Sequence, residues 1–253
     1  MYATCPKCGF KSEEGAAPPT SCPDCGLIYS KWLKSLASDP EYSEQIAEPK
    51  LATNRFRVSP GLVAVFLRAK PNVDWGEVFG YGLIWLLLLW LGLDFLAMDF
   101  RSATIMNHWF HNVDLIFHEA GHVIFSPFGR WMTFFGGSAF QVLLPLGLLV
   151  AFLVMNKDAF AASACLWWAG QSMKDVAPYI ADARALRLPL LGGGTGADRP
   201  GSHDWANLLR PLGMLNEDIR IAAIADTIGS GLILIALVWG VYMLWVYYRE
   251  AIN

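Results

Sequence analysis

The chain has 253 residues, of which 55% are hydrophobic and 16% are charged, whereas typical soluble domains have about 25% charged residues. A formal net charge of −3 argues against a general nucleic-acid binder, which needs an excess of Lys and Arg. Eleven Trp and eight Tyr are typical of anchoring at membrane interfaces. We therefore expect an all-α polytopic membrane protein, with about five transmembrane helices and a small N-terminal β zinc-ribbon domain.

The ribbon is predicted from two C-x-x-C pairs in the first 30 residues, which are separated by 13 residues and each followed by glycine. This spacing is typical of four thiolates that hold one structural Zn²⁺ and order short β-hairpins. The four predicted ligands are Cys5, Cys8, Cys22 and Cys25. Two disulfides are the alternative, and they would need an oxidising compartment. A four-thiolate site is coordinatively closed, so we expect residues 1–30 to bind a protein partner or to regulate.

Residues 31–75 are predicted to form a polar linker between the ribbon and the membrane region. Within it Val58–Lys70 is amphipathic, so this segment is either a helix on the membrane surface or part of the linker. Residues 76–253 are predicted to be the transmembrane domain. Its apolar runs predict five spans: Phe79–Met98, Ile105–Phe128, a third that ends at Met155, Ala159–Ile180 and Gly229–Tyr248.

The second predicted span contains His118-Glu119-Ala120-Gly121-His122, which is an H-E-x-x-H motif. Residues four apart share a helix face, so His118 and His122 can bind one catalytic Zn²⁺. Glu119 can then serve as the general base for a water molecule that the metal activates. The alternative is a membrane helix whose histidines pack against polar partners. Ionisable groups at membrane depth are costly and usually functional, which favours the metal site.

A catalytic zinc needs three protein ligands and one open position, so a third ligand must lie elsewhere. Asp175 and Asp182 end the fourth predicted span and share a helical face if the helix continues through Pro178, which tends to break helices. His203 lies in the following loop and can fold back as a ligand, an acid, an oxyanion donor or a substrate contact. The residues alone leave these alternatives open.

The placement of Lys and Arg predicts the orientation in the membrane. These residues gather before the first span and in the loop over residues 183–220. The positive-inside rule would place both segments in the cytoplasm. Five spans then put the N-terminus inside and the C-terminus outside. Cytoplasmic thiols would also stay reduced and available to a metal.

These motifs resemble the site-2 protease family of intramembrane zinc metalloproteases. The resemblance rests on H-E-x-x-H in a membrane helix, on Gly136-Gly137, and on a later signature similar to N-x-x-P-x-x-x-x-D-G. Here the chain reads Asp175-Val176-Ala177-Pro178-Tyr179-Ile180-Ala181-Asp182-Ala183. The proline offset matches, but the final Asp is one residue nearer, Asp replaces Asn and Ala replaces Gly.

The resemblance covers about residues 105–183 and implies that Asp182 is the third zinc ligand, with Asp175 at the position of the family's Asn. It also implies that Gly136-Gly137 forms a strand-like edge that receives the substrate as an added strand. A plain turn is the alternative there.

We therefore expect an intramembrane zinc endopeptidase that cleaves membrane-embedded protein substrates near the cytoplasmic side, with Glu119 and His203 as catalytic candidates. It would use one catalytic and one structural zinc, and its partners would be the lipid bilayer, a membrane protein substrate and a protein bound at the ribbon. One alternative is a membrane zinc hydrolase that acts on lipid or amide bonds. Another is a non-catalytic scaffold whose ribbon binds a partner.

Overall fold

The computed structural model of the chain describes residues 4–11, 20–32, 61–70, 73–102 and 104–252. The chain divides into two compact units, Met1–Arg57 and Val58–Asn253. Most of the predicted linker, residues 33–60, lies outside the described residues. The two units are considered separately below.

The first unit contains two similar turns, each built on one C-x-x-C pair. The amide of Gly9 donates to the carbonyl of Cys5 at 2.9 Å, and the amide of Gly26 donates to that of Cys22 at 2.9 Å. Both glycines have positive φ, 77° and 70°, which favours glycine over residues with a side chain. In the described residues of this unit, the expected β-hairpins are reduced to two isolated bridges, Thr4 with Lys11 and Ser21 with Ile28.

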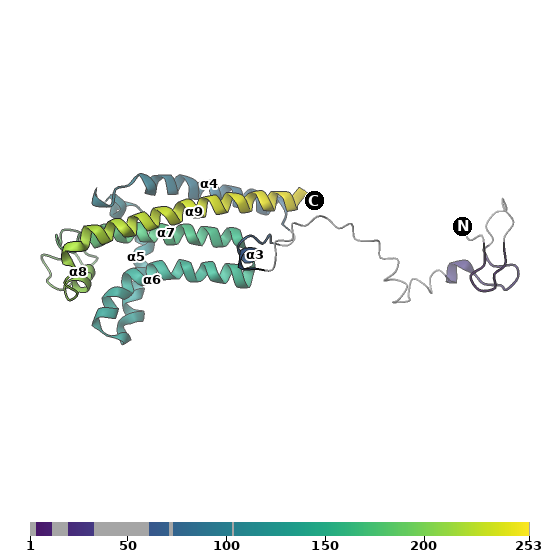
Figure 1. The fold of residues 1–253 in the computed structure, drawn as a ribbon, viewed down its shortest axis with the longest axis horizontal. Coiled ribbons are helices and arrows are strands. Elements are labelled where there is room, and N and C mark those ends of the chain that lie inside the picture. The colour runs from purple at the N-terminus through teal and green to yellow at the C-terminus, as the bar shows by residue number, and fades with distance from the viewer. Residues whose placement is uncertain (1–3, 12–19, 33–60, 71–72, 103, 253) are drawn as a thin grey trace. The chain divides into compact units, whose positions relative to one another are not determined.

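The second unit is mostly helical, and its described residues contain no continuous strand. Four long helices are α4 (Trp75–Ala97), α6 (Arg130–Ala151), α7 (Ala159–Ala181) and α9 (Asp218–Ile252), which pack together along their lengths (Figure 1). Three shorter helices are α3 (Leu62–Phe66), α5 (His111–Phe125) and α8 (Asp204–Leu209). Single helical turns lie at Phe100–Ser102, Thr104–Asn107, Ser126–Phe128, Phe152–Asn156 and Leu215–Glu217.

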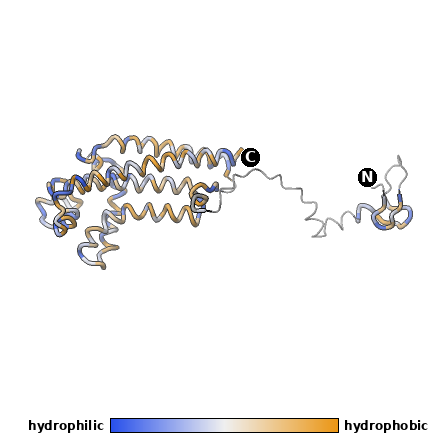
Figure 2. The backbone as a smooth tube through the Cα atoms, viewed as in Figure 1, coloured by the Kyte–Doolittle hydropathy of each residue, from blue (hydrophilic) through white to orange (hydrophobic). Residues whose placement is uncertain are grey.

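Three of the described helical segments are long and apolar enough to cross a membrane: Trp75–Ala97, Arg130–Asn156 and Leu215–Ile252. A helix of 23 residues such as α4 is about 35 Å long at ~1.5 Å per residue, and the hydrocarbon core of a bilayer is about 30 Å thick. Figure 2 shows that apolar residues run along these helices. The predicted helical membrane class is thus supported by length and composition.

Helix α7 is as long as α4 but more polar, because it lies in the middle of the unit. It contacts α4, α6 and α9, and its buried residues include Lys174 and Asp175, which are 1% and 4% exposed. Polar side chains that face other helices avoid lipid. The helix continues through Pro178 to Ala181, so the break expected at this proline does not occur.

Two core clusters show which helix ends lie together. One joins the start of α4 and of α7 to the last turns of α6 and α9: Val73, Leu153, Ala159, Phe160, Ala162, Met243 and Tyr247. The other joins the ends of α4 and α7 to the start of α9: Phe100, Val176, Ala177, Ile180, Ala222 and Ala225. Helices α4 and α7 therefore run in one direction, and α6 and α9 run in the other.

Among the described residues, the helices long and apolar enough to cross a membrane cover three of the five expected spans, namely the first, third and fifth. Helix α5 has 15 residues, about 22 Å, and connects α4 to α6 at one end of the unit, because α6 begins where α4 finishes. The segment before α4 and the loop over residues 183–217 lie at opposite ends of the unit, so they would lie on opposite sides of a membrane that the long helices cross.

The turn at Lys157 and the loop that contains Gly193 should face opposite sides of the membrane, because α7 runs from one to the other. We expect an epitope inserted at Lys157 and one inserted at Gly193 to bind antibody from opposite faces of sealed membrane vesicles. Detection of both epitopes from one face, with neither exposed on the other, would contradict this arrangement.

Candidate metal centres

The two histidines of the H-E-x-x-H motif reach the interior at a glycine contact between α5 and α6. A Cβ atom at Gly121 would lie 2.2 Å from the Gly136 carbonyl oxygen. A Cβ atom at Gly137 would lie 2.6 Å from Nε2 of His118 and 2.8 Å from Nε2 of His122. Glycine is therefore required at this contact. Gly136-Gly137 belongs to α6, so it forms neither the strand-like edge nor the turn expected there.

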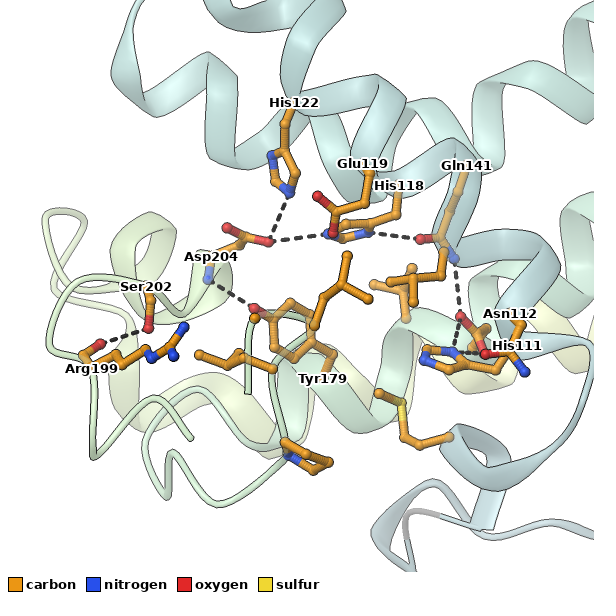
Figure 3. A pocket seen from close by; sticks show the side chains of 18 residues that line it. His111, Asn112, His118, Glu119, His122, Gln141, Tyr179, Arg199, Ser202 and Asp204 are labelled. Atoms are coloured by element: carbon orange, nitrogen blue, oxygen red, sulfur yellow. Dashed lines mark hydrogen bonds and ion pairs between the residues drawn. The ribbon is translucent and has the colours of Figure 1, made fainter. Parts of the chain in front are cut away.

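The imidazoles of His118 and His122 converge on the carboxylate of Asp204 (Figure 3). Nε2 of His118 lies 3.1 Å and Nε2 of His122 lies 3.3 Å from Oδ2 of Asp204. Two imidazoles and one carboxylate are a known zinc ligand set. Ligand atoms about 2.0 Å from a tetrahedral ion lie about 3.3 Å apart, which matches these separations.

The hydrogen bonds on the other ring nitrogens fit a cation between these groups. Nδ1 of His122 lies 2.8 Å from the carbonyl oxygen of Thr133, which can only accept, so this nitrogen carries a proton. Without a metal, the hydrogen bond with the Asp204 carboxylate raises the pKa of His122 to about 9, so Nε2 carries a proton and donates to Asp204. A metal ion can take the place of this proton, with Nε2 and the carboxylate as its ligands. His118 likewise places Nδ1 2.9 Å from Oε1 of Gln141.

Asp204 reaches the histidines because the loop after α7 folds back and starts the short helix α8. His203 caps this helix, with Nδ1 accepting from the amide of Ala206 at 3.3 Å. The imidazole of His203 stacks on the ring of Tyr179 at a centroid distance of 4.2 Å. The hydroxyl of Tyr179 accepts from the Asp204 amide at 3.2 Å. These contacts fix the backbone that carries the carboxylate.

Helix α8 is also tied to α6, because the indole of Trp205 donates to the hydroxyl of Ser138 at 3.0 Å. Burial works to raise the pKa of Asp204, but hydrogen bonds to the two imidazoles outweigh it and hold that pKa below its ordinary value. Asp204 is therefore an ionised carboxylate at neutral pH, which is the form that binds a metal.

Asp182, the third ligand implied by the family resemblance, lies outside this group. Its carboxylate accepts from the amides of Arg187 at 2.9 Å and Leu188 at 2.8 Å. Oδ2 of Asp182 also lies 3.4 Å from Nε2 of His203. Burial works to raise the pKa of Asp182, but these partners outweigh it and lower that pKa. Asp182 thus holds the loop and His203 in place, and Asp204 occupies the position expected for Asp182.

The other two candidates for the third ligand are also placed elsewhere. Asp175 pairs with His111 on α5. His203 is 2% exposed and acts as a helix cap, so it is not among the residues that line the cavity beside the histidines. The sequence signal for Asp204 was its position next to His203 in a loop able to fold back. Spacing along the chain cannot show which of the two side chains points inward.

A cavity of about 490 Å³ adjoins the two histidines and Asp204. Its lining comes from α5, α6, α7, α8 and the 189–202 loop (Figure 3). Glu119 lines the cavity, and its carboxylate makes no hydrogen bond or ion pair with any described residue. The Gly192–Gly196 segment forms part of a turn closed by a bridge from Pro189 to Thr195. This turn contributes one wall of the cavity.

The second candidate metal group is the cysteine cluster of the first unit. Sγ of Cys5 lies 3.8 Å from that of Cys25, and Sγ of Cys8 lies 3.6 Å from that of Cys22. All four are free thiols, which disagrees with the disulfide alternative. Sulfur atoms about 2.3 Å from a tetrahedral zinc ion lie about 3.8 Å apart, which these distances match.

The thiols of this cluster differ in acidity. Burial works to raise the pKa of Cys5, but backbone amides and neighbouring thiols lower it to about 6. The backbone of Phe10 works to lower the pKa of Cys8, but burial and the neighbouring sulfurs raise it to about 12. A cation is therefore needed to hold all four residues as thiolates together.

Comparison of the chain with known protein families, with curated proteins and with solved structures finds no match. The resemblance to site-2 proteases therefore rests on the motif residues alone. What the chain does has to be inferred from the chemistry of its two metal-ligand groups.

Gly137→Ala should weaken metal binding at the histidines, because the added methyl group would displace both imidazoles. We expect a loss of zinc affinity of about tenfold or more, measured by competition with a chelator. Gly147→Ala is the matched control on the same helix, since a Cβ atom there meets nothing within 4 Å. Equal zinc affinity in Gly137→Ala and Gly147→Ala would contradict a metal site at the imidazoles beside Gly137.

Proposed function

We propose that this chain is an intramembrane zinc endopeptidase whose catalytic zinc is held by His118, His122 and Asp204. The observation that carries the proposal is the convergence of these three groups beside the unpaired carboxylate of Glu119 in one cavity. Three protein ligands leave the fourth position of a tetrahedral zinc open, as catalysis requires.

The residues around the metal would divide the hydrolytic reaction between them. Zn²⁺ bound there would supply Lewis-acid chemistry to a water molecule and to the scissile carbonyl. Glu119 would remove a proton from the attacking water and later give it to the leaving amine. Gln141 and the carbonyl of Thr133 would keep both imidazoles oriented through their Nδ1 atoms.

The lining of the cavity favours a peptide over a lipid. His111, Asn112, Arg199 and Ser202 offer hydrogen-bonding groups away from the metal. An extended peptide can use such partners along its backbone, whereas an acyl chain cannot. Ile116 on α5 is 67% exposed and apolar, which suits a surface that meets lipid or a membrane-embedded substrate.

We further propose that α4, α6, α7 and α9 cross the membrane and that the N-terminus is cytoplasmic, where its four thiols stay reduced. The metal centre lies toward the end of the helical unit where α4 and α7 finish, together with the 183–217 loop. It would then act near the opposite face of the membrane, in place of cleavage near the cytoplasmic side. The cysteine cluster would hold a structural zinc and bind a protein partner.

Zinc content tests the two metal groups separately. We expect the purified full chain to hold about two zinc ions, and His122→Ala and Cys25→Ser to hold about one each. Elemental analysis with thermal unfolding measures both content and folding. A parent chain whose zinc is unchanged by His122→Ala would contradict the catalytic site and favour a scaffold with one structural zinc.

Cleavage tests the chemistry. Zinc-loaded protein in lipid vesicles should cut single-span peptides, and Glu119→Gln should lower the rate by about 10²-fold or more because the general base is lost. Glu217→Gln makes the same chemical change at a residue outside the cavity and should leave the rate unchanged. Hydrolysis of lipid but not peptide, again dependent on Glu119, would replace the peptidase with the lipid-hydrolase alternative.

A further inference from the structure

His111 is a third histidine in the catalytic cavity. It begins α5 two helical turns before His118 and lines the same cavity, with its side chain 16% exposed. Nδ1 of His111 lies 2.9 Å from Oδ1 and 3.1 Å from Oδ2 of Asp175. Asp175 itself is 4% exposed, so this is a buried pair beside the cavity.

The same carboxylate also receives a second donor. Nε2 of Gln141 donates to Oδ2 of Asp175 at 3.3 Å and to the carbonyl oxygen of Ser172 at 3.4 Å. Both partners are acceptors, so the amino group of Gln141 must face them. The amide oxygen Oε1 must then face His118.

This orientation decides where His118 carries its proton. Oε1 of Gln141 can only accept, so Nδ1 of His118, 2.9 Å away, donates. Nε2 of His118 is left with its lone pair directed at the metal position. Asp175 therefore acts on His118 through Gln141, although it does not touch that imidazole.

Asp175 also determines which ring nitrogen of His111 carries the proton, here by direct contact. Its Nδ1 donates to the carboxylate, so in the neutral ring Nε2 is the acceptor. His111 and His118 are seven residues apart on one helix face, a rise of about 10.5 Å. An extended peptide advances about 3.3 Å per residue, so Nε2 of His111 would meet a substrate amide about three residues from the cleaved bond.

We propose that Asp175 is a positioning residue that fixes the tautomers of both imidazoles, His118 through Gln141 and His111 directly. The inference rests on the proposed metal centre for its first part, and on the contact between Asp175 and His111 for its second. One carboxylate thereby prepares one histidine for the metal and the other for the substrate.

The first arm measures metal binding in the full chain. Asp175→Ala should weaken zinc binding at the histidines by about tenfold or more, because the Gln141 amide is no longer held. Asp158→Ala removes another buried acid, the N-cap of α7, which binds Tyr81 and Tyr247 away from the cavity. It should leave zinc affinity unchanged even where it lowers the unfolding temperature. Equal zinc affinities of Asp175→Ala and the parent would overturn the His118 part.

The second arm reads tautomers from ¹⁵N shifts of labelled histidine, with His111 assigned from the signal lost in His111→Gln. The parent should show the proton on Nδ1 of His111. Asp175→Ala removes both acceptor oxygens, so Nδ1 loses its partner and the proton should no longer be held there. A His111 proton that stays on Nδ1 in Asp175→Ala would overturn the second part. A parent chain without zinc at the histidines would instead refute the proposed function. The second arm would still test whether Asp175 holds the His111 proton on Nδ1, because that measurement does not depend on zinc.

Discussion

The candidate metal centre depends on how closely α5 and α6 approach. Gly121 and Gly136 bring the two backbones together, and Gly137 leaves the space that the imidazoles of His118 and His122 occupy. A methyl group at any of these positions would meet backbone or imidazole atoms at less than 3.0 Å. Protein interiors are closely packed, so the imidazoles fit between the two helices only because the glycines lack a Cβ atom. The glycines therefore determine both the helix packing and the direction of the ligands.

Once the imidazoles are inside, each needs partners, because an unsatisfied polar group away from water is costly. Thr133 and Gln141 accept from the Nδ1 atoms, and Asp204 faces the Nε2 atoms. The amino group of Gln141 in turn donates to the carboxylate of Asp175. The polar groups form one connected network, and it is ordered so that lone pairs and negative charge meet at the metal position.

Local features of this arrangement were predictable, and long-range ones were not. The H-E-x-x-H motif places His118 and His122 on one face through helix geometry alone, and the cysteine pairs form their cluster through tight turns. The third ligand depends on a loop that reverses direction, so the residues alone left several candidates open and the family resemblance implied Asp182, whereas the structure brings Asp204 to the two histidines. Hydropathy likewise detected apolar residues around α5 but not that the helix there has only 15 residues and connects α4 to α6 at one end of the unit.

The reversed loop suggests why a metal would matter for structure as well as chemistry. Helix α8 has six residues, and isolated helices shorter than about 12 residues are marginal in water. Tyr179 and the bond from Trp205 to Ser138 hold α8 in place without a metal. A metal bound to Asp204 would add a link from α8 to both histidines of α5. Since binding stabilises the state that binds, a metal bound there would further stabilise the folded position of α8.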